Sequence, residues 1–203
     1  MLDLAQHCSL RESLAGYAAA FGPRALRADA LSQPRCHTLI VPAAVEIPLP
    51  VMRAIETCLH AGGRVILESG AGFAGEWEFH AHRAVLRAAL QIDVLPPVGL
   101  WPRPHARAIP YIDYTWPIPI KIRDFSRVVP MSCEAGDIIG LVDGVPVAVR
   151  RPSGHGTLIV LGSPLGPALW AGDGDARRWL DAVAALTSEP QTTGPGPPRP
   201  RAP

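Results

Sequence analysis

HTLIVPAAVEIPLPVMRAIETCLHAGGRVILESGAGFAG, residues 37–75, is the stretch of this sequence that decides the fold. Its residues 38–41 and 65–67 are unbroken apolar runs, which are typical of strands buried on both faces of a parallel sheet. Between these runs, apolar residues recur every four positions and predict a helix with one apolar face, at Val51, Ile55 and Leu59. Gly62 and Gly63 suit the end of that helix. The stretch therefore predicts a strand–helix–strand unit with the usual right-handed crossover.

The composition fits one α/β domain, which we place at residues 1–187. The formal net charge of +1 gives no reason to expect nucleic acid or an anionic membrane surface as a partner. No window holds the roughly 18 apolar residues that a membrane span needs, and residues 1–12 lack the pattern of a secretory signal. The four cysteines are widely spaced and form no CxxC pair, which favours a reducing, cytoplasmic location. No motif calls for a cofactor.

The remaining helices and strands follow from local patterns. Helices are predicted over residues 9–20, 79–90 and 175–186, and short strands over 25–29 and 92–95. Residues 137–162 read as a hairpin section, because apolar runs flank the strong turn signal Asp143-Gly144. The apolar run 157–161 then predicts a third buried strand.

Two segments are rich in proline. Residues 96–130 predict an irregular excursion with at most edge strands near 118–122, because proline removes the hydrogen-bond donor that a central strand needs. This excursion either folds back over the sheet or forms a ligand lid or partner surface, since long irregular loops are often functional. Residues 188–203 predict a disordered tail.

These segments together resemble a known fold. The strand, the helix ending in Ala61-Gly62-Gly63, the second strand and the Gly/Ser loop are followed by a hairpin at 144–149, a strand at 154–162 and a closing helix. The pattern resembles the class I glutamine amidotransferase-like superfamily over residues 35–186, and within it the non-catalytic β-galactosidase trimerisation-type domain. The resemblance implies a flavodoxin-like open sheet, mostly parallel and flanked by helices, with an antiparallel hairpin section at 137–162.

The resemblance leaves the first strand of that fold open. Such folds normally begin with a strand, and no good candidate precedes the helix predicted from Ser9. Either residues 1–7 supply it, or it is missing or comes from another chain.

The chemistry of the amidotransferases is missing from the matching positions. In that family a cysteine nucleophile lies in a G-x-C-x-G turn after the second strand, where this chain has Leu67-Glu68-Ser69-Gly70-Ala71. The family's His-x-Glu pair would follow the last strand, where this chain has Gly162-Ser163-Pro164. Nucleophile and base are both absent, so we do not expect glutamine amidotransferase activity.

Ser69 is the candidate for a different nucleophile. A serine needs a base within hydrogen-bond reach, and His155 or one of the pair His80 and His82 could supply it. The interpretation that we favour is that Ser69 and the following glycines only form a tight strand-to-helix turn. That loop still lies at the carboxyl end of a strand, where α/β folds bind ligands.

We therefore predict a ligand-binding or partner-binding surface from this loop and the aromatic excursion. Its expected residues are Ser69, Gly70, Gly72, Phe73, Trp101, Tyr114 and Trp116. A weaker alternative is a metal site built on Glu78, His80 and His82, because zinc accepts these groups. Ordinary polarity of a surface helix explains the three residues better.

The leading functional hypothesis is a non-catalytic, amidotransferase-like domain that binds a ligand or a protein partner, or supports assembly of a homo-oligomer. The alternative is a small hydrolase or carbohydrate-related enzyme that uses Ser69 and a histidine in the same cleft. The two differ in geometry, since an enzyme needs an imidazole close to Ser69 and a binding module does not.

Overall fold

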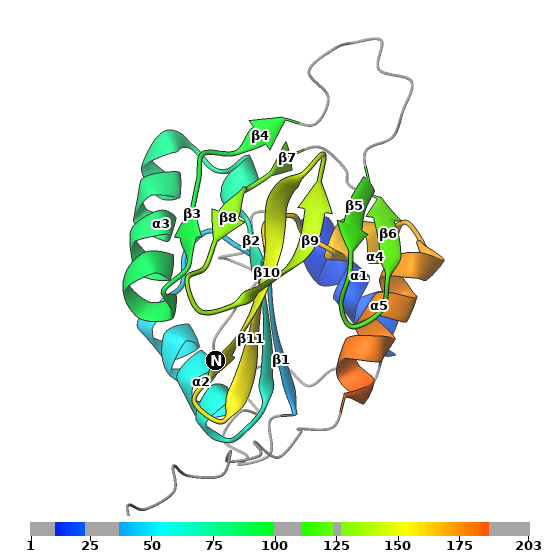
Figure 1. Cartoon of the computed structure of the whole chain (residues 1–203), viewed down its shortest axis with the longest axis horizontal. Coiled ribbons are helices and arrows are strands. Elements are labelled where there is room, and N and C mark those ends of the chain that lie inside the picture. The colour runs from blue at the N-terminus through cyan, green and yellow to red at the C-terminus, as the bar shows by residue number, and fades with distance from the viewer. Residues whose placement is uncertain (1–10, 23–36, 100–110, 124–126, 187–203) are drawn as a thin grey trace, which may run out of the picture.

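The computed structural model describes residues 11–22, 37–99, 111–123 and 127–186. A seven-stranded sheet forms its centre, with the strand order β1-β2-β11-β10-β9-β5-β6 (Figure 1). The elements are α1 (Arg11–Phe21), β1 (Thr38–Ala44), α2 (Leu49–His60), β2 (Arg64–Ser69), the 3-10 turn η4 (Ala71–Phe73), α3 (Glu76–Leu90), β3 (Asp93–Val94), β4 (Val98–Gly99), β5 (Tyr111–Tyr114), β6 (Ile120–Arg123), β7 (Arg127–Val128), β8 (Met131–Ser132), β9 (Asp137–Val142), β10 (Val145–Ser153), β11 (Gly156–Leu161), α4 (Gly166–Trp170) and α5 (Gly174–Ala185).

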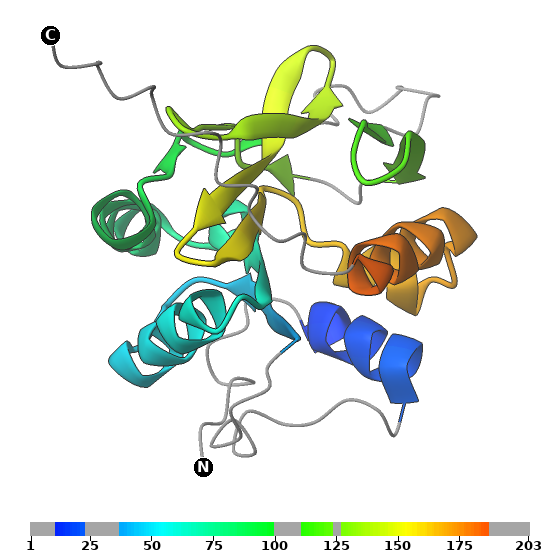
Figure 2. The same ribbon diagram turned by 60° about the horizontal axis from the view of Figure 1, so that its bottom comes forward.

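The helices cover the two faces of this sheet. Helices α2 and α3 lie on one side, and α1, α4 and α5 lie on the other (Figure 2). Two apolar clusters fill the space between helices and sheet, one packed around Ile55 and Leu86, the other around Trp179. In the described residues, no helix is both long enough and apolar enough to cross a membrane.

The strand–helix–strand unit that the sequence predicts is confirmed. Strands β1 and β2 pair in parallel with Leu39 opposite Val65, and all six residues of β2 are buried. Between them, α2 buries Val51, Ile55 and Leu59. The helix ends at His60, and Gly62 follows with a φ of 81°, a left-handed conformation that glycine adopts without steric cost.

The prediction of a mostly parallel sheet was wrong. Of the strand pairs in the seven-stranded sheet, β1–β2 and β2–β11 are parallel, and the pairs that follow from β11 to β6 are antiparallel. The reason is that hairpins extend the sheet beyond β11, whereas a parallel neighbour would need a long crossover for each added strand. The protein is thus a mixed α/β fold with a short parallel section at one edge.

The hairpin section is confirmed, and the proline-rich excursion contributes more than predicted. Asp143 and Gly144, with φ of 48° and 79°, join β9 to β10 in the turn that the sequence indicates.

The edge strand predicted near 118–122 is present as β6. Strand β5, which the sequence analysis did not predict, pairs β6 with the rest of the sheet and buries Ile112 and Tyr114.

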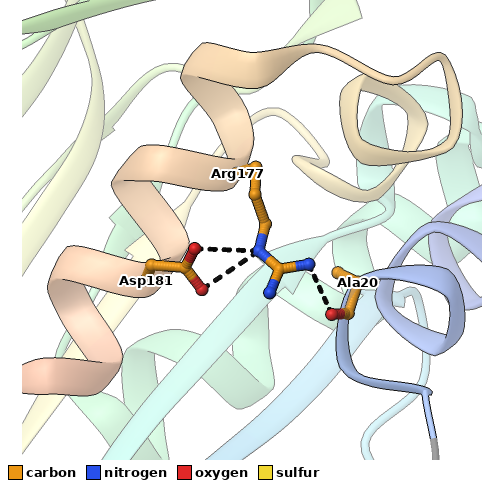
Figure 3. Close-up of polar contacts among 3 residues, drawn as sticks. All are labelled: Ala20, Arg177 and Asp181. Carbon is orange, nitrogen blue, oxygen red and sulfur yellow. Dashed lines mark hydrogen bonds and ion pairs between the residues drawn. The ribbon is translucent and has the colours of Figure 1, made fainter.

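Helices α1, α3 and α5 lie close to their predicted positions, and α4 is an additional short helix. Arg177 on α5 donates a hydrogen bond of 2.5 Å to the carbonyl of Ala20 in the last turn of α1 and pairs with Asp181 (Figure 3). This contact joins the end of α1 to α5 at the surface. The predictions for residues 1–10, 25–29 and 188–203 lie outside the described residues.

Candidate functional site

Two neighbouring polar side chains end β2 and point to opposite faces of the sheet. Side chains alternate along a strand, so Glu68 faces α1 and α4, and Ser69 faces α3. Both are buried, with exposed fractions of 0% and 1%. The carboxyl end of β2 therefore carries two separate polar groups, one on each side.

Ser69 meets a histidine on α3. Its Oγ lies 3.0 Å from Nε2 of His82, and Nδ1 of His82 lies 2.8 Å from the carbonyl oxygen of Val45. A carbonyl only accepts, so Nδ1 carries the proton and Nε2 accepts from the Ser69 hydroxyl. Burial lowers the pKa of His82, and the bond to Val45 opposes that shift only partly. His82 is therefore a neutral imidazole with a fixed tautomer.

This pair has the arrangement of a serine beside its general base, with one difference. In a hydrolytic triad a carboxylate stands behind the imidazole and stabilises its positive charge. Here the main-chain carbonyl of Val45 takes that place, which orients the ring but carries no net charge. The pair is also covered, because His82 is only 1% exposed and the residues Ala71 and Gly72 that follow Ser69 are buried.

The same bonds hold the loop after β2 in place. The amide of Ala71 approaches the Ser69 hydroxyl at 3.4 Å, and the amide of Gly70 donates to the carbonyl of Ala44 at 2.9 Å. Together with the contacts of His82, they join the ends of β1 and β2 to α3. The hydroxyl and the imidazole thus have a structural use that accounts for their positions.

On the opposite face, Glu68 accepts hydrogen bonds from several parts of the fold. Its Oε2 accepts from the hydroxyl of Ser13 at 2.5 Å and the amide of Ala43 at 3.0 Å. Its Oε1 accepts from the hydroxyl of Tyr17 at 2.6 Å and the amides of Leu165 and Gly166 at 2.7 and 3.2 Å. The carboxylate therefore joins α1 to the ends of β1 and β11.

Burial and hydrogen bonding act in opposite directions on this carboxyl group. Burial raises the pKa of Glu68, and the bonds from Ser13, Tyr17, Leu165 and Ala43 lower it in part. The pKa of Tyr17 is raised well above its usual value, first by burial and then by the negative charge of Glu68. The raised pKa of Tyr17 agrees with a phenol that stays protonated and donates to the carboxyl group of Glu68.

The structure places His155, one of the histidines considered for Ser69, far from that serine. His155 lies in the turn before β11, beside the start of β2, because Thr157 pairs with Arg64 in the parallel register. Ser69 is at the other end of β2. Of the histidines that the sequence offered, His82 is the one in contact.

The structure places those predicted ligand-binding residues that it describes in two separate regions of the fold. Gly70 and Gly72 are buried beside Ser69, and the backbone of Phe73 belongs to η4. Tyr114 packs on Trp179 in the other apolar cluster, and three strands separate β5 from β2. Trp116 lies 4.7 Å beneath the guanidinium of Arg150, and Trp101 lies outside the described residues.

The alternative metal ligands also stay apart. His82 is engaged with Ser69 and Val45, whereas His80 is exposed and lies 3.9 Å from Glu76. Glu78 is exposed in the first turn of α3. Among the described residues, no group of three or more His, Cys, Asp or Glu side chains could hold a metal ion.

Sequence reasoning did not identify Glu68. The available signal was a carboxylate directly after an unbroken apolar run, since a charged group at a buried strand position needs partners. The partners themselves are distant in sequence and come from α1 and the segment before α4. Only the assembled fold brings them together.

Comparisons with solved structures find a similar fold within longer chains. No family model and no curated protein matches the chain. The β-galactosidase of Rahnella sp. R3 is similar with a TM-score of 0.54 and 15% identity, covering 73% of this chain and 22% of that one. A GH42 β-galactosidase from G. stearothermophilus has a TM-score of 0.54 and 14% identity, covering 79% and 25%. An exo-β-1,4-mannosidase from Opitutaceae bacterium strain TAV5 has a TM-score of 0.50 and 14% identity, covering 77% and 28%.

These likenesses show a shared fold. The chain spans about a quarter of the length of the solved structures it matches.

Proposed function

We propose that this chain is a non-catalytic, glutamine amidotransferase-like domain of carbohydrate-related proteins, which acts in ligand binding, partner binding or assembly. One observation carries the proposal. Ser69, at the position that matches the family's nucleophile, is 1% exposed, and its hydrogen bonds hold its own loop and α3 in place. A nucleophile has to reach a substrate atom, and this one is enclosed by the fold. The partial match to glycoside hydrolase chains supports the carbohydrate link.

Exposed apolar side chains support a role in contacts with another molecule. Trp77 is 84% exposed and Leu49 is 63% exposed. They belong to the first turns of α3 and α2, which follow the carboxyl ends of β2 and β1 on the same side of the sheet. Large exposed aromatic side chains are enriched where proteins bind one another. We place the surface that binds a second copy or a protein partner around these two side chains. We also propose that the protein is cytoplasmic.

Light scattering after gel filtration tests the assembly role. We expect the wild-type chain to show a mass above that of one copy, and Trp77→Ala to lower it. Trp170→Ala is the matched control, because Trp170 is 60% exposed on α4 at the other face of the sheet. A wild-type chain that stays monomeric at high concentration would exclude self-assembly. Titration with galactosides and mannosides then tests ligand binding.

The hydrolase remains the second candidate, and the 3.0 Å contact between Ser69 and His82 favours it. A fluorophosphonate probe, which reacts with activated serines, separates the two functions by intact mass. The non-catalytic domain should remain unlabelled. Labelling that disappears in both Ser69→Ala and His82→Ala would favour the hydrolase instead.

A further inference from the structure

We propose that the carboxyl ends of β1, β2 and β11 form a preformed carboxylate-binding site on the α1 side of the sheet, and that Glu68 occupies it as an internal ligand. When the Glu68 side chain is removed, this site binds a small carboxylate ion such as formate or acetate. The inference does not depend on the proposed function.

The site is built from donors that all point at one carboxylate. The described residues supply the hydroxyls of Ser13 and Tyr17 and the amides of Ala43, Leu165 and Gly166, at distances from 2.5 to 3.2 Å. A main-chain amide can only donate, so at least three of these groups require an acceptor. Buried donors left without one carry a large desolvation cost, which favours an anion in this position.

The backbone is arranged around the carboxylate. Ala43 has a φ of 36°, uncommon for a residue with a Cβ, at the irregularity where the β1–β2 register shifts between Val41 and Ala44. The amide of Ala43 donates to Glu68 at this point. A strained backbone persists only where its surroundings hold it in place.

Close packing of glycines places the two hydroxyls. A Cβ on Gly16 would lie 1.9 Å from the carbonyl oxygen of Gly166, so α1 touches the start of α4 through bare backbone. Ser13 and Tyr17 are one helical turn apart on α1, and this approach puts both beside Glu68. The position of α1 and the geometry of the site are therefore coupled.

It follows that the α1 side of the sheet differs from an open ligand crevice. Parallel strands usually present this edge to an external ligand, but here the anionic group belongs to the chain itself. The carboxylate of Glu68 links α1 to the sheet through the hydrogen bonds that it accepts from Ser13 and Tyr17. We expect α1 to stay packed against the sheet as long as a carboxylate occupies this site.

Chemical rescue of Glu68→Ala tests the proposal by thermal unfolding at pH 7. Loss of a buried, multiply bonded charge should lower Tm by roughly 10 °C. We expect 100 mM sodium formate to raise the Tm of Glu68→Ala by about 3–5 °C over sodium chloride at equal ionic strength, as binding of about ten times its Kd would. Adding Tyr17→Phe should reduce this gain. Wild type and Glu78→Ala, which lacks an exposed carboxylate, should respond equally to both salts.

Equal Tm values of Glu68→Ala in formate and in chloride would overturn the proposal, and folding only in formate would support it. If Glu68→Ala folds in neither salt, a double-mutant cycle decides the matter. Tyr17→Phe should then raise the unfolding constant about tenfold more in the wild type than in Glu68→Gln, because a bond to a charged acceptor is the stronger one. Equal effects in the two backgrounds would refute an anionic Glu68 as the partner.

Discussion

Protonation of His82 should weaken the protein at mildly acidic pH. Burial lowers the pKa of His82 in the folded state below its usual value of about 6.5. Below pH ~6.5 the unfolded chain therefore binds a proton at this residue that the folded chain does not bind. Stability rises with pH wherever the unfolded state binds more protons. The contribution of a neutral His82 is thus complete above about pH 6.5 and is lost as the pH falls toward the folded pKa.

The size of this pH effect follows from the binding of one additional proton by the unfolded chain. The free energy of unfolding should fall by up to about 1.4 kcal/mol per pH unit in that window on account of His82 alone. The geometry explains why the protonated ring is unfavourable. Nδ1 already donates to Val45, so the added proton on Nε2 turns the acceptor of the Ser69 hydroxyl into a second donor.

Urea unfolding at several pH values between 5 and 8 measures this effect. His82→Gln removes the titrating ring, so its free energy of unfolding should depend less on pH than that of the wild type. This variant should also be about 1–3 kcal/mol less stable at pH 8, because it loses one of the two hydrogen bonds of His82. His80→Gln is the matched control, since His80 is exposed two residues earlier on the same helix. Burial raises the pKa of Glu68, so this residue changes the pH dependence of the unfolding free energy with the opposite sign. That change is the same in all three proteins and does not affect their comparison. Parallel curves for wild type and His82→Gln would refute the reasoning.

Two further predictions concern the attachment of α1. Gly16→Ala should destabilise the protein by about 2 kcal/mol or more in urea unfolding, because its Cβ would overlap the carbonyl of Gly166, and only a shift of α1 could relieve this. Gly174→Ala, where a Cβ would meet nothing within 4 Å, should stay within about 0.5 kcal/mol, and an equal loss in both would contradict the packing argument. Arg177→Ala should cost at most about 1 kcal/mol, because its bonds to Ala20 and Asp181 are exposed to solvent. A larger loss would show that this contact is a main support of α1.

The sequence was most informative where one local pattern decided the structure. The runs 38–41 and 65–67 became buried parallel strands, and Asp143-Gly144 became the predicted turn, because neither depends on distant residues for its identity. Strand β5 was missed because its short alternating pattern lies among prolines, and its pairing with β9 and β6 comes from the tertiary fold. The prediction of a mostly parallel sheet was wrong because hairpins, which add antiparallel strands, extend the sheet beyond β11.

In the candidate site, too, some features follow from a local sequence pattern and others only from the tertiary fold. The sequence indicated Ser69 and a histidine, but the choice among His80, His82 and His155 depends on which face of α3 packs against β2 and on the direction of β11. Glu68 could be noticed as a charge after an apolar run, while its donors come from segments up to 98 residues away. Patterns in one segment therefore predict which residues are unusual, and only the fold determines their partners.

The end of β2 is closed on both faces, and this is the physical reason for preferring a non-catalytic role. Glu68 uses its two oxygens to attach α1, and Ser69 uses its hydroxyl to attach α3. Catalysis by Ser69 would require η4 to separate from β7, where Arg127 donates to the carbonyl of Gly72 at 3.3 Å. Hydrogen exchange tests whether such opening occurs. In a rigid binding domain the amide of Gly70, which donates to Ala44, should exchange as slowly as the core amides of β2. Exchange orders of magnitude faster than in β2 would reveal an opening that exposes Ser69, and would transfer the preference to the hydrolase.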